Sequence, residues 1–85
     1  MKLIDGHDSA FIGMTMVWRE HGTTDVAVYS GEKIINNLMA QGMTEHEAIE
    51  YCAFNIEGAY VGEDTPIIVW NADLQEAIEM YAPVV

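Results

Sequence analysis

The residues best suited to chemistry lie near the start of the chain, where Asp5-Gly6-His7-Asp8 places two carboxylates and an imidazole within four positions. His and Asp are common metal ligands, so this group could begin a metal site. Asp and Gly also favour turns, and no matching cluster of His or Cys occurs elsewhere in the sequence. We therefore expect a turn here, with no bound metal and no cofactor.

A second candidate is the loop from Gly58 to Thr65, which contains Gly58, Gly62, Glu63 and Asp64. Its carboxylates could bind a hard cation, but too few oxygen ligands fall at alternate positions for a calcium loop. The loop also lacks the Lys of a phosphate-binding motif, and its acids would repel phosphate. Together with the Asp5–Asp8 turn, this loop supports one alternative function, a small-ligand or metal-binding module.

Covalent catalysis requires a nucleophile, a base and an orienting group within reach of one another. Cys52 falls on an apolar helical face, which is typical of an inert core thiol. As the single cysteine it excludes an internal disulfide and fits a reducing compartment. Ser9 and Ser30 have no partner motif nearby. We therefore expect that the protein is not an enzyme.

The charge distribution is the feature that points most directly to a function. The chain has 14 Asp and Glu against 3 Lys and Arg, a net charge of −11, and no Lys or Arg after Lys33. Such charge repels nucleic acid and anionic membrane surfaces. No apolar run approaches the ~20 residues that span a bilayer. We expect a soluble cytoplasmic protein whose partner presents a basic protein surface.

The acidic residues of the second half are expected to gather on helices. A helix turns about 100° per residue, which places Glu47, Glu50 and Glu57 of the predicted helix 45–57 on one face, with Phe54 among them. A large ring surrounded by charges resembles an interface hot spot. The predicted partner-binding residues are Glu47, Glu50, Tyr51, Phe54, Glu57, Asp73, Glu76 and Glu79.

A stricter form of this hypothesis is mimicry of nucleic acid. Carboxylates one helical turn apart lie ~5–6 Å apart, close enough to engage several Lys or Arg of a nucleic-acid-binding surface. Two simpler interpretations stay open at this point. One is a solvated helix surface without a partner, and the other is a Phe54 that packs beneath the last helix.

These side chains must be positioned by strands and helices that the periodicity indicates. Alternating residues predict a strand over Ser9–Trp18, and a second strand follows over residues 24–29. The connection between them, residues 19–23, contains a glycine and suits a hairpin. Pro66–Trp70 is an unbroken apolar run, typical of a strand buried on both faces. The first strand is apolar on both sides, which would suit a sheet packed in a homodimer.

The predicted helices span residues 31–41, 45–57 and 72–81. Ser30 and Asn71 are expected N-caps, and Thr44 with Glu47 fits a capping box. Pro83 would terminate the last helix. The apolar side of that helix comprises Leu74, Ala77, Ile78 and Tyr81.

The order β-β-α-α-β-α predicts an α+β fold: a small two-layer domain with a three-stranded sheet and three helices on one face. Eighty-five residues leave no room for a second core, so residues 1–85 form a single domain. A homo-oligomeric structural protein is the other alternative function.

Two stretches of the chain are similar to those of a known group of proteins. The first is Asp5-Gly6-His7-Asp8-Ser9-Ala10-Phe11-Ile12-Gly13. The second begins at Met43-Thr44-Glu45-His46-Glu47-Ala48 and runs into Phe54-Asn55-Ile56-Glu57-Gly58-Ala59-Tyr60-Val61-Gly62-Glu63-Asp64-Thr65-Pro66-Ile67. They resemble small proteins carried by bacteriophages and marine viruses, over roughly residues 3–69. The resemblance carries no activity and implies only a phage accessory context. The expected function is therefore an acidic phage accessory protein that binds a basic surface of a host or defence protein in the host cytoplasm.

Overall fold

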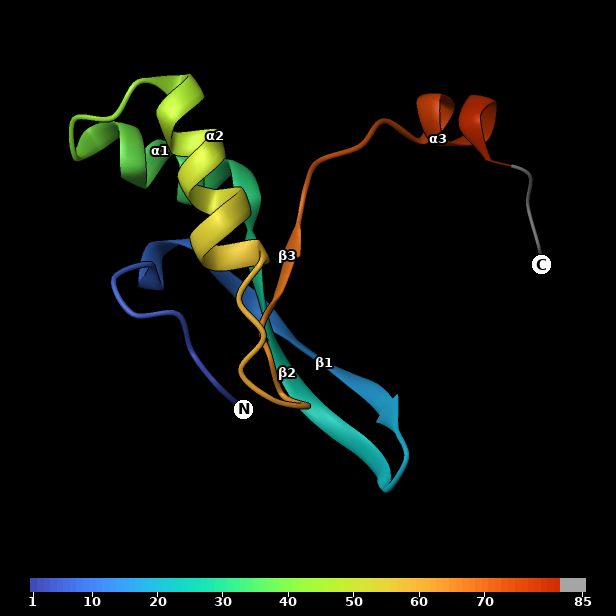
Figure 1. The fold of residues 1–85 in the computed structure, drawn as a ribbon. Helices are drawn as coiled ribbons and strands as arrows, with labels where there is room; N and C mark the ends of the chain where they lie inside the picture. The colour runs from blue at the N-terminus through green and yellow to red at the C-terminus, as the bar shows by residue number, and fades with distance from the viewer. Residues whose placement is uncertain (82–85) are drawn as a thin grey trace.

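The computed structural model describes residues 1–81 and has the predicted architecture, a three-stranded mixed sheet with helices in the order β-β-α-α-β-α (Figure 1). The α+β fold class is therefore confirmed. The elements are the short 3-10 helix η1 (Asp8–Ala10), β1 (Phe11–Arg19), β2 (Gly22–Ser30), α1 (Gly31–Ala40), α2 (Glu45–Cys52), the π-helical turn η2 (Ala53–Glu57), β3 (Ile67–Val69) and α3 (Leu74–Met80).

The sheet has the order β1-β2-β3. β1 and β2 form an antiparallel hairpin whose turn is shorter than predicted, because Arg19 already pairs with Gly22. β3 runs parallel to β2, with Val69 opposite Ser30. The prediction that this strand is buried on both faces is wrong. β3 lies at an edge of the sheet, and its residues are half-buried or exposed.

A small core lies between one side of the sheet and the helices α1 and α2. It is made of Ala10, Ala27, Tyr29, Ile34, Ile35, Leu38, Ala48 and Cys52. Both predicted caps of these helices form. Ser30 Oγ accepts from Lys33 N at 3.3 Å, and Thr44 and Glu47 exchange hydrogen bonds of 2.9 and 3.2 Å. The caps satisfy backbone donors that the first turn of a helix leaves free.

The second predicted helix changes its winding after Cys52. The amide of Gly58 donates to the carbonyl of Ala53 at 3.0 Å, five residues back, as in a π-turn. This wider turn rotates the residues after Cys52 away from the positions that a regular α-helix would give them. Ala59, which follows this turn, is exposed although helical phase predicts it in the core. Ile49 is also exposed, but it lies in the regular part of α2 before the turn.

The connection from β3 to α3 is held at the start of α1. The ring of Trp70 lies directly over Gly31, where an added Cβ would come within 2.4 Å of the ring. Trp70 Nε1 donates to Glu57 at 3.3 Å, and the Asn71 amide donates to Glu32 Oε1 at 2.9 Å. Only a residue without a side chain allows this approach.

Beyond this anchor α3 stands apart from α1 and α2, at the end of an extended segment (Figure 1). It begins after Asp73, whose side chain accepts from Gln75 N at 3.0 Å, so the predicted cap at Asn71 is wrong. None of its seven residues is buried. The expectation that α3 packs on the sheet is therefore also wrong. The chain leaves the sheet after Val69, where Trp70 holds it against Gly31. Pro83 lies outside the described residues.

Candidate functional site

Phe54 projects from η2 into solvent, with 80% of its surface exposed. This excludes the interpretation that Phe54 packs beneath α3. Beside it are Glu47, Glu50 and Tyr51, all exposed and spaced by one turn along the helix. We call these four residues the acidic–aromatic face. With Met43 and Asn55 they line an open hollow of about 370 Å³.

The capping box sets the electrostatics of this face as well as the start of α2. The Thr44 backbone amide and hydroxyl bind the Glu47 carboxylate and lower the pKa of Glu47 below its ordinary value. Hydrogen bonds to the charged form of a carboxyl have this effect. Glu47 therefore stays ionised at neutral pH. Glu50 lies 2.9 Å from His46 Nε2 on the same exposed helix.

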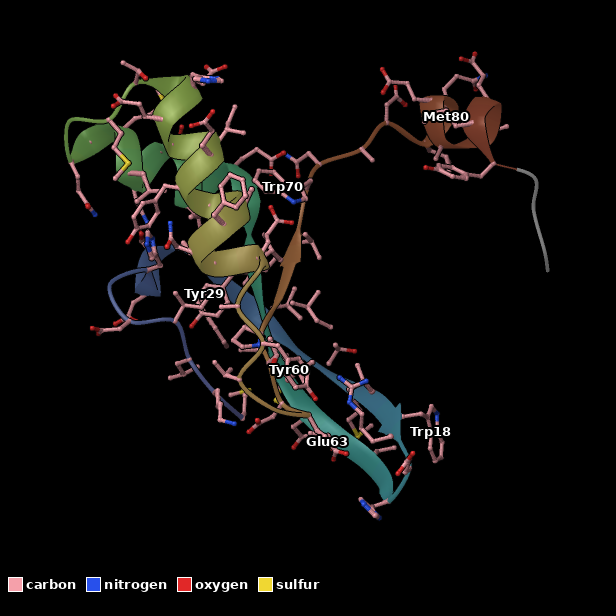
Figure 2. All side chains as sticks on the ribbon, viewed as in Figure 1. Trp18, Tyr29, Tyr60, Glu63, Trp70 and Met80 are labelled. Atoms are coloured by element: carbon pink, nitrogen blue, oxygen red, sulfur yellow. The ribbon has the colours of Figure 1, made fainter. Side chains whose placement is uncertain are left out.

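Glu57 does not join the acidic–aromatic face, although helical phase predicts that it does. Its carboxylate turns to the opposite side, where Oε2 accepts from Trp70 Nε1 and Oε1 lies 4.0 Å from Cys52 Sγ. The π-turn causes this difference, because its wider winding turns through a smaller angle per residue than an α-helix, so Glu57 lags behind the position that helical phase predicts. Figure 2 shows Trp70 beside the end of this helix. Burial, and then the Glu57 charge, raise the pKa of Cys52.

The acidic residues of α3 form a second, separate patch. Asp73 serves as the N-cap, and Glu79 accepts from Gln75 Nε2 at 3.4 Å, while Glu76 is exposed. Because α3 stands away from α2 in Figure 1, the carboxylates of the two helices do not form one continuous row. Among the described residues, α2 and α3 therefore do not supply the single long row of carboxylates that one form of nucleic-acid mimicry would use.

The loop Gly58–Thr65 is tied to the N-terminal segment by its acid. Asp64 binds Lys2 Nζ at 2.8 Å and the Met1 amine at 3.4 Å, and Lys2 also donates to the Val61 carbonyl. The hydrogen bond from Lys2 is the main reason that the pKa of Asp64 lies below its usual value. The Glu63 carbonyl accepts from Arg19 Nε at 3.1 Å. The Lys2 ammonium group thus binds the Asp64 carboxylate, which was a candidate ligand for a cation in this loop.

The Asp5–Asp8 turn also serves the fold. His7 is buried, and its Nδ1 lies 3.3 Å from Asn37 Nδ2 on α1, whereas Asp5 and Asp8 are exposed. Between residues 1 and 81, no group of three or more His, Cys, Asp or Glu side chains is arranged to hold a metal ion. In the same span, no helix has the length and apolar character needed to cross a membrane.

An apolar cleft of about 480 Å³ lies between the N-terminal segment and this loop. It is lined by Lys2, Leu3, Ile4, Asn55, Ile56, Ala59, Val61, Thr65 and Pro66. Small-molecule sites combine such a volume with convergent polar groups that are free to bind. Here Lys2, Asn55 and Thr65 already make intramolecular hydrogen bonds. The cleft is therefore a weaker candidate than the acidic–aromatic face.

Comparison of this chain with known protein families, with curated proteins and with solved structures finds no match. The residues that sequence reasoning missed at the face are Met43 and Asn55, which complete the hollow. The helical spacing of Asn55 from Tyr51 could have indicated it, since such pairs share a face. Met43 precedes α2, and only the entry of the chain into the helix places it there.

Proposed function

We propose that this chain is an acidic accessory protein, of the phage type that its sequence resembles, and that it binds a basic surface of a host or defence protein. The acidic–aromatic face is the binding surface. The observation that carries the proposal is Phe54, a large apolar ring held in solvent beside Glu47 and Glu50. Cytoplasmic action in the host cell is part of the same proposal.

The face combines two contributions to binding that differ in their dependence on salt. Burial of an exposed Phe side chain against a partner contributes about 1.5–3 kcal/mol and changes little with ionic strength. The carboxylates accelerate association with a cationic partner and orient it, and this contribution is screened by salt. Binding should therefore weaken with salt. The Phe54 contribution should persist.

Glu47 and Glu50 alone are too few to imitate the charge density of a nucleic acid, which has one charge per ~1.7 Å of duplex axis. We therefore limit the proposal to a local basic patch on a protein. Catalysis and small-ligand binding are not part of it.

The test is affinity capture from host lysate at low and high salt with mass-spectrometric identification, run in parallel on variants. Glu47→Gln with Glu50→Gln should reduce capture of the specific partner by up to about thirtyfold at low salt, because exposed ion pairs contribute up to about 1 kcal/mol each. Phe54→Ala should reduce it roughly tenfold or more. Gln at position 47 preserves the capping box.

The matched control is Glu76→Gln with Glu79→Gln, which removes the same charge from α3 and should leave capture unchanged. Equal loss in both double variants would mean that net charge alone drives binding. Full retention by the Glu47, Glu50 and Phe54 variants would reject the acidic–aromatic face.

A further inference from the structure

The far half of β1 carries an exposed apolar row. Met14, Met16 and Trp18 alternate along the strand, with 54%, 65% and 81% of their surfaces exposed. Met14 lies opposite Ala27 of the core, so the row continues the core side of the sheet beyond α1 and α2. Figure 2 shows Trp18 beside the hairpin turn, at the opposite end of the hairpin from these helices. We call these residues the β1 row.

α3 presents a complementary stripe. Leu74 and Ile78 lie one turn apart on the helix, and Tyr81 follows as its C-cap residue; they are 73%, 57% and 68% exposed. An isolated helix shorter than about 12–15 residues is marginal in water, because nucleation costs more than a few turns recover. α3 has seven residues and buries none of them. Its stability therefore requires an apolar surface to pack on.

The dimensions of the whole molecule indicate how much surface lacks a cover. A compact monomer of 9.5 kDa exposes about 5,000 Å², whereas this chain exposes 6254 Å². Its radius of gyration is 14.6 Å, against about 12 Å for a compact domain of this length. The excess of about 1,200 Å² exceeds the roughly 800 Å² that each partner buries in a standard stable interface.

The path of the chain carries α3 away from the β1 row of its own sheet, because β3 runs towards the Ser30 end of β2 and away from the hairpin turn. Val69 pairs with Ser30 at one end of β2, whereas Trp18 pairs with Thr23 near the hairpin turn. These positions are separated by about 23 Å along the strand. Trp70 holds the start of the connection at Gly31, and residues 70–74 span at most about 14 Å. To lie along the row of its own chain, α3 would have to reverse the direction in which the chain leaves β3, with this connection fully extended.

We propose that the occupant of the β1 row is α3 from a second copy of this chain, and that two copies exchange these helices reciprocally. A twofold axis places the end of one sheet from which α3 departs beside the hairpin turn of the other sheet. Each α3 then meets the β1 row of the other copy. The lengths agree, since the row extends about 13 Å and α3 about 10 Å. Thr23 and Asp25 of β2 lie opposite Trp18 and Met16 and form a polar rim.

The dimer and the proposed partner complex respond in opposite directions to salt. Each copy carries a net charge of −11, so association of two copies works against charge repulsion. Raising the salt concentration should tighten the dimer and weaken binding of a basic partner. The two proposals can therefore fail independently.

The first test is light scattering during size-exclusion chromatography of the full chain at several concentrations and two salt concentrations. The expected mass is twice 9.5 kDa, and the dimer fraction should rise with salt. Leu74→Glu with Ile78→Glu should shift the protein to 9.5 kDa while its core circular-dichroism signal is retained. Phe54→Ala should remain dimeric. A wild-type monomer at millimolar concentration would overturn the proposal.

The second test locates the contact with disulfides in a Cys52→Ala background. Chains carrying Met16→Cys are mixed with chains carrying Ile78→Cys and are oxidised. A mixed disulfide dimer should form, and neither variant alone should form one at a comparable rate. A third variant combines Ile49→Cys and Ile78→Cys in one chain. Rapid closure of a bond within that chain, without the mixed dimer, would mean that α3 covers its own helices and would overturn the exchange.

Discussion

The core beneath α1 and α2 and the exposed surfaces of β1 and α3 contain the same kinds of side chain, which the core buries and the surfaces leave in solvent. Near α1 and α2, Tyr29 is fully buried, its ring contacts Phe11 edge-on at 5.6 Å, and its hydroxyl accepts from the Ile4 amide at 2.9 Å. In contrast, Trp18 on β1 and Leu74 on α3 lie in solvent. The comparison teaches that the side chains packed between the sheet and the helices α1 and α2 stabilise the fold, while exposed side chains on β1, α3 and η2 offer surface for contact.

The largest expected effect contrasts two aromatic residues. Tyr29→Ala should cost about 3–5 kcal/mol of unfolding free energy, as large-to-small changes of core aromatic residues do. The free energy of unfolding of a small domain is only about 5–15 kcal/mol, so this loss could unfold much of the protein. Phe54→Ala, with the ring in solvent, should change stability by less than about 0.5 kcal/mol. Urea unfolding measures both, and comparable losses would contradict the division between buried and exposed aromatic side chains.

An intermediate effect is expected where the segment that leads to α3 contacts the start of α1. Gly31→Ala places a methyl group against the Trp70 ring and should cost about 1–3 kcal/mol by overpacking. In a Trp18→Phe background, the fluorescence of Trp70 should shift towards that of an exposed indole.

The control for this prediction removes the ring. In a Trp70→Ala background the same Gly31→Ala change should become neutral or stabilising, because Ala favours a helix over Gly by about 1 kcal/mol. An identical cost in both backgrounds would show that the ring contact is not the cause.

The smallest expected effect concerns the cap that orders the acidic–aromatic face. Thr44→Ala should cost about 1 kcal/mol of unfolding free energy, and Thr44→Ser should cost little. The capping box lowers the pKa of Glu47 from an ordinary value of 4.5. Its stabilisation is therefore present above pH 4.5 and is lost as the pH falls through the lower folded value.

The loss of stability at acidic pH tests the direction of this effect. In Thr44→Ala the fall in stability below about pH 4.5 should be shallower than in the wild type, because the Glu47 pKa returns towards its unfolded value. Thermal unfolding between pH 3 and 7 measures the difference. An unchanged acid limb would assign it to other carboxyls, of which Asp64 is the first candidate.

Local signals in the sequence were sufficient for the element order and for two helix starts. Ser30 and the Thr44–Glu47 box act within three residues, so their prediction needs no tertiary information. The exposure of the acidic–aromatic face at Glu47, Glu50 and Phe54 also agrees with helical phase.

The remaining features depend on contacts between distant residues. Helical phase failed at Glu57 because the chain adopts a π-turn after Cys52, and Glu57 there accepts a hydrogen bond from Trp70, 13 residues away. The position of α3 could not be predicted from its apolar stripe, since a stripe shows that a helix needs cover and does not say which chain provides it. Trp70 over Gly31 fixes where the chain leaves the sheet, and this contact joins residues 39 positions apart.

β1 is the outermost strand of its sheet, with one side paired to β2 and its other backbone edge unpaired in the sheet order. Open strand edges invite further strands to add, and natural proteins guard against this with charge. In this protein the overall negative charge keeps such edges of different molecules apart, and the net charge falls to zero near pH 4.2. Mild acid should therefore turn a clear preparation cloudy, with growing intermolecular β-structure, before the core itself has melted.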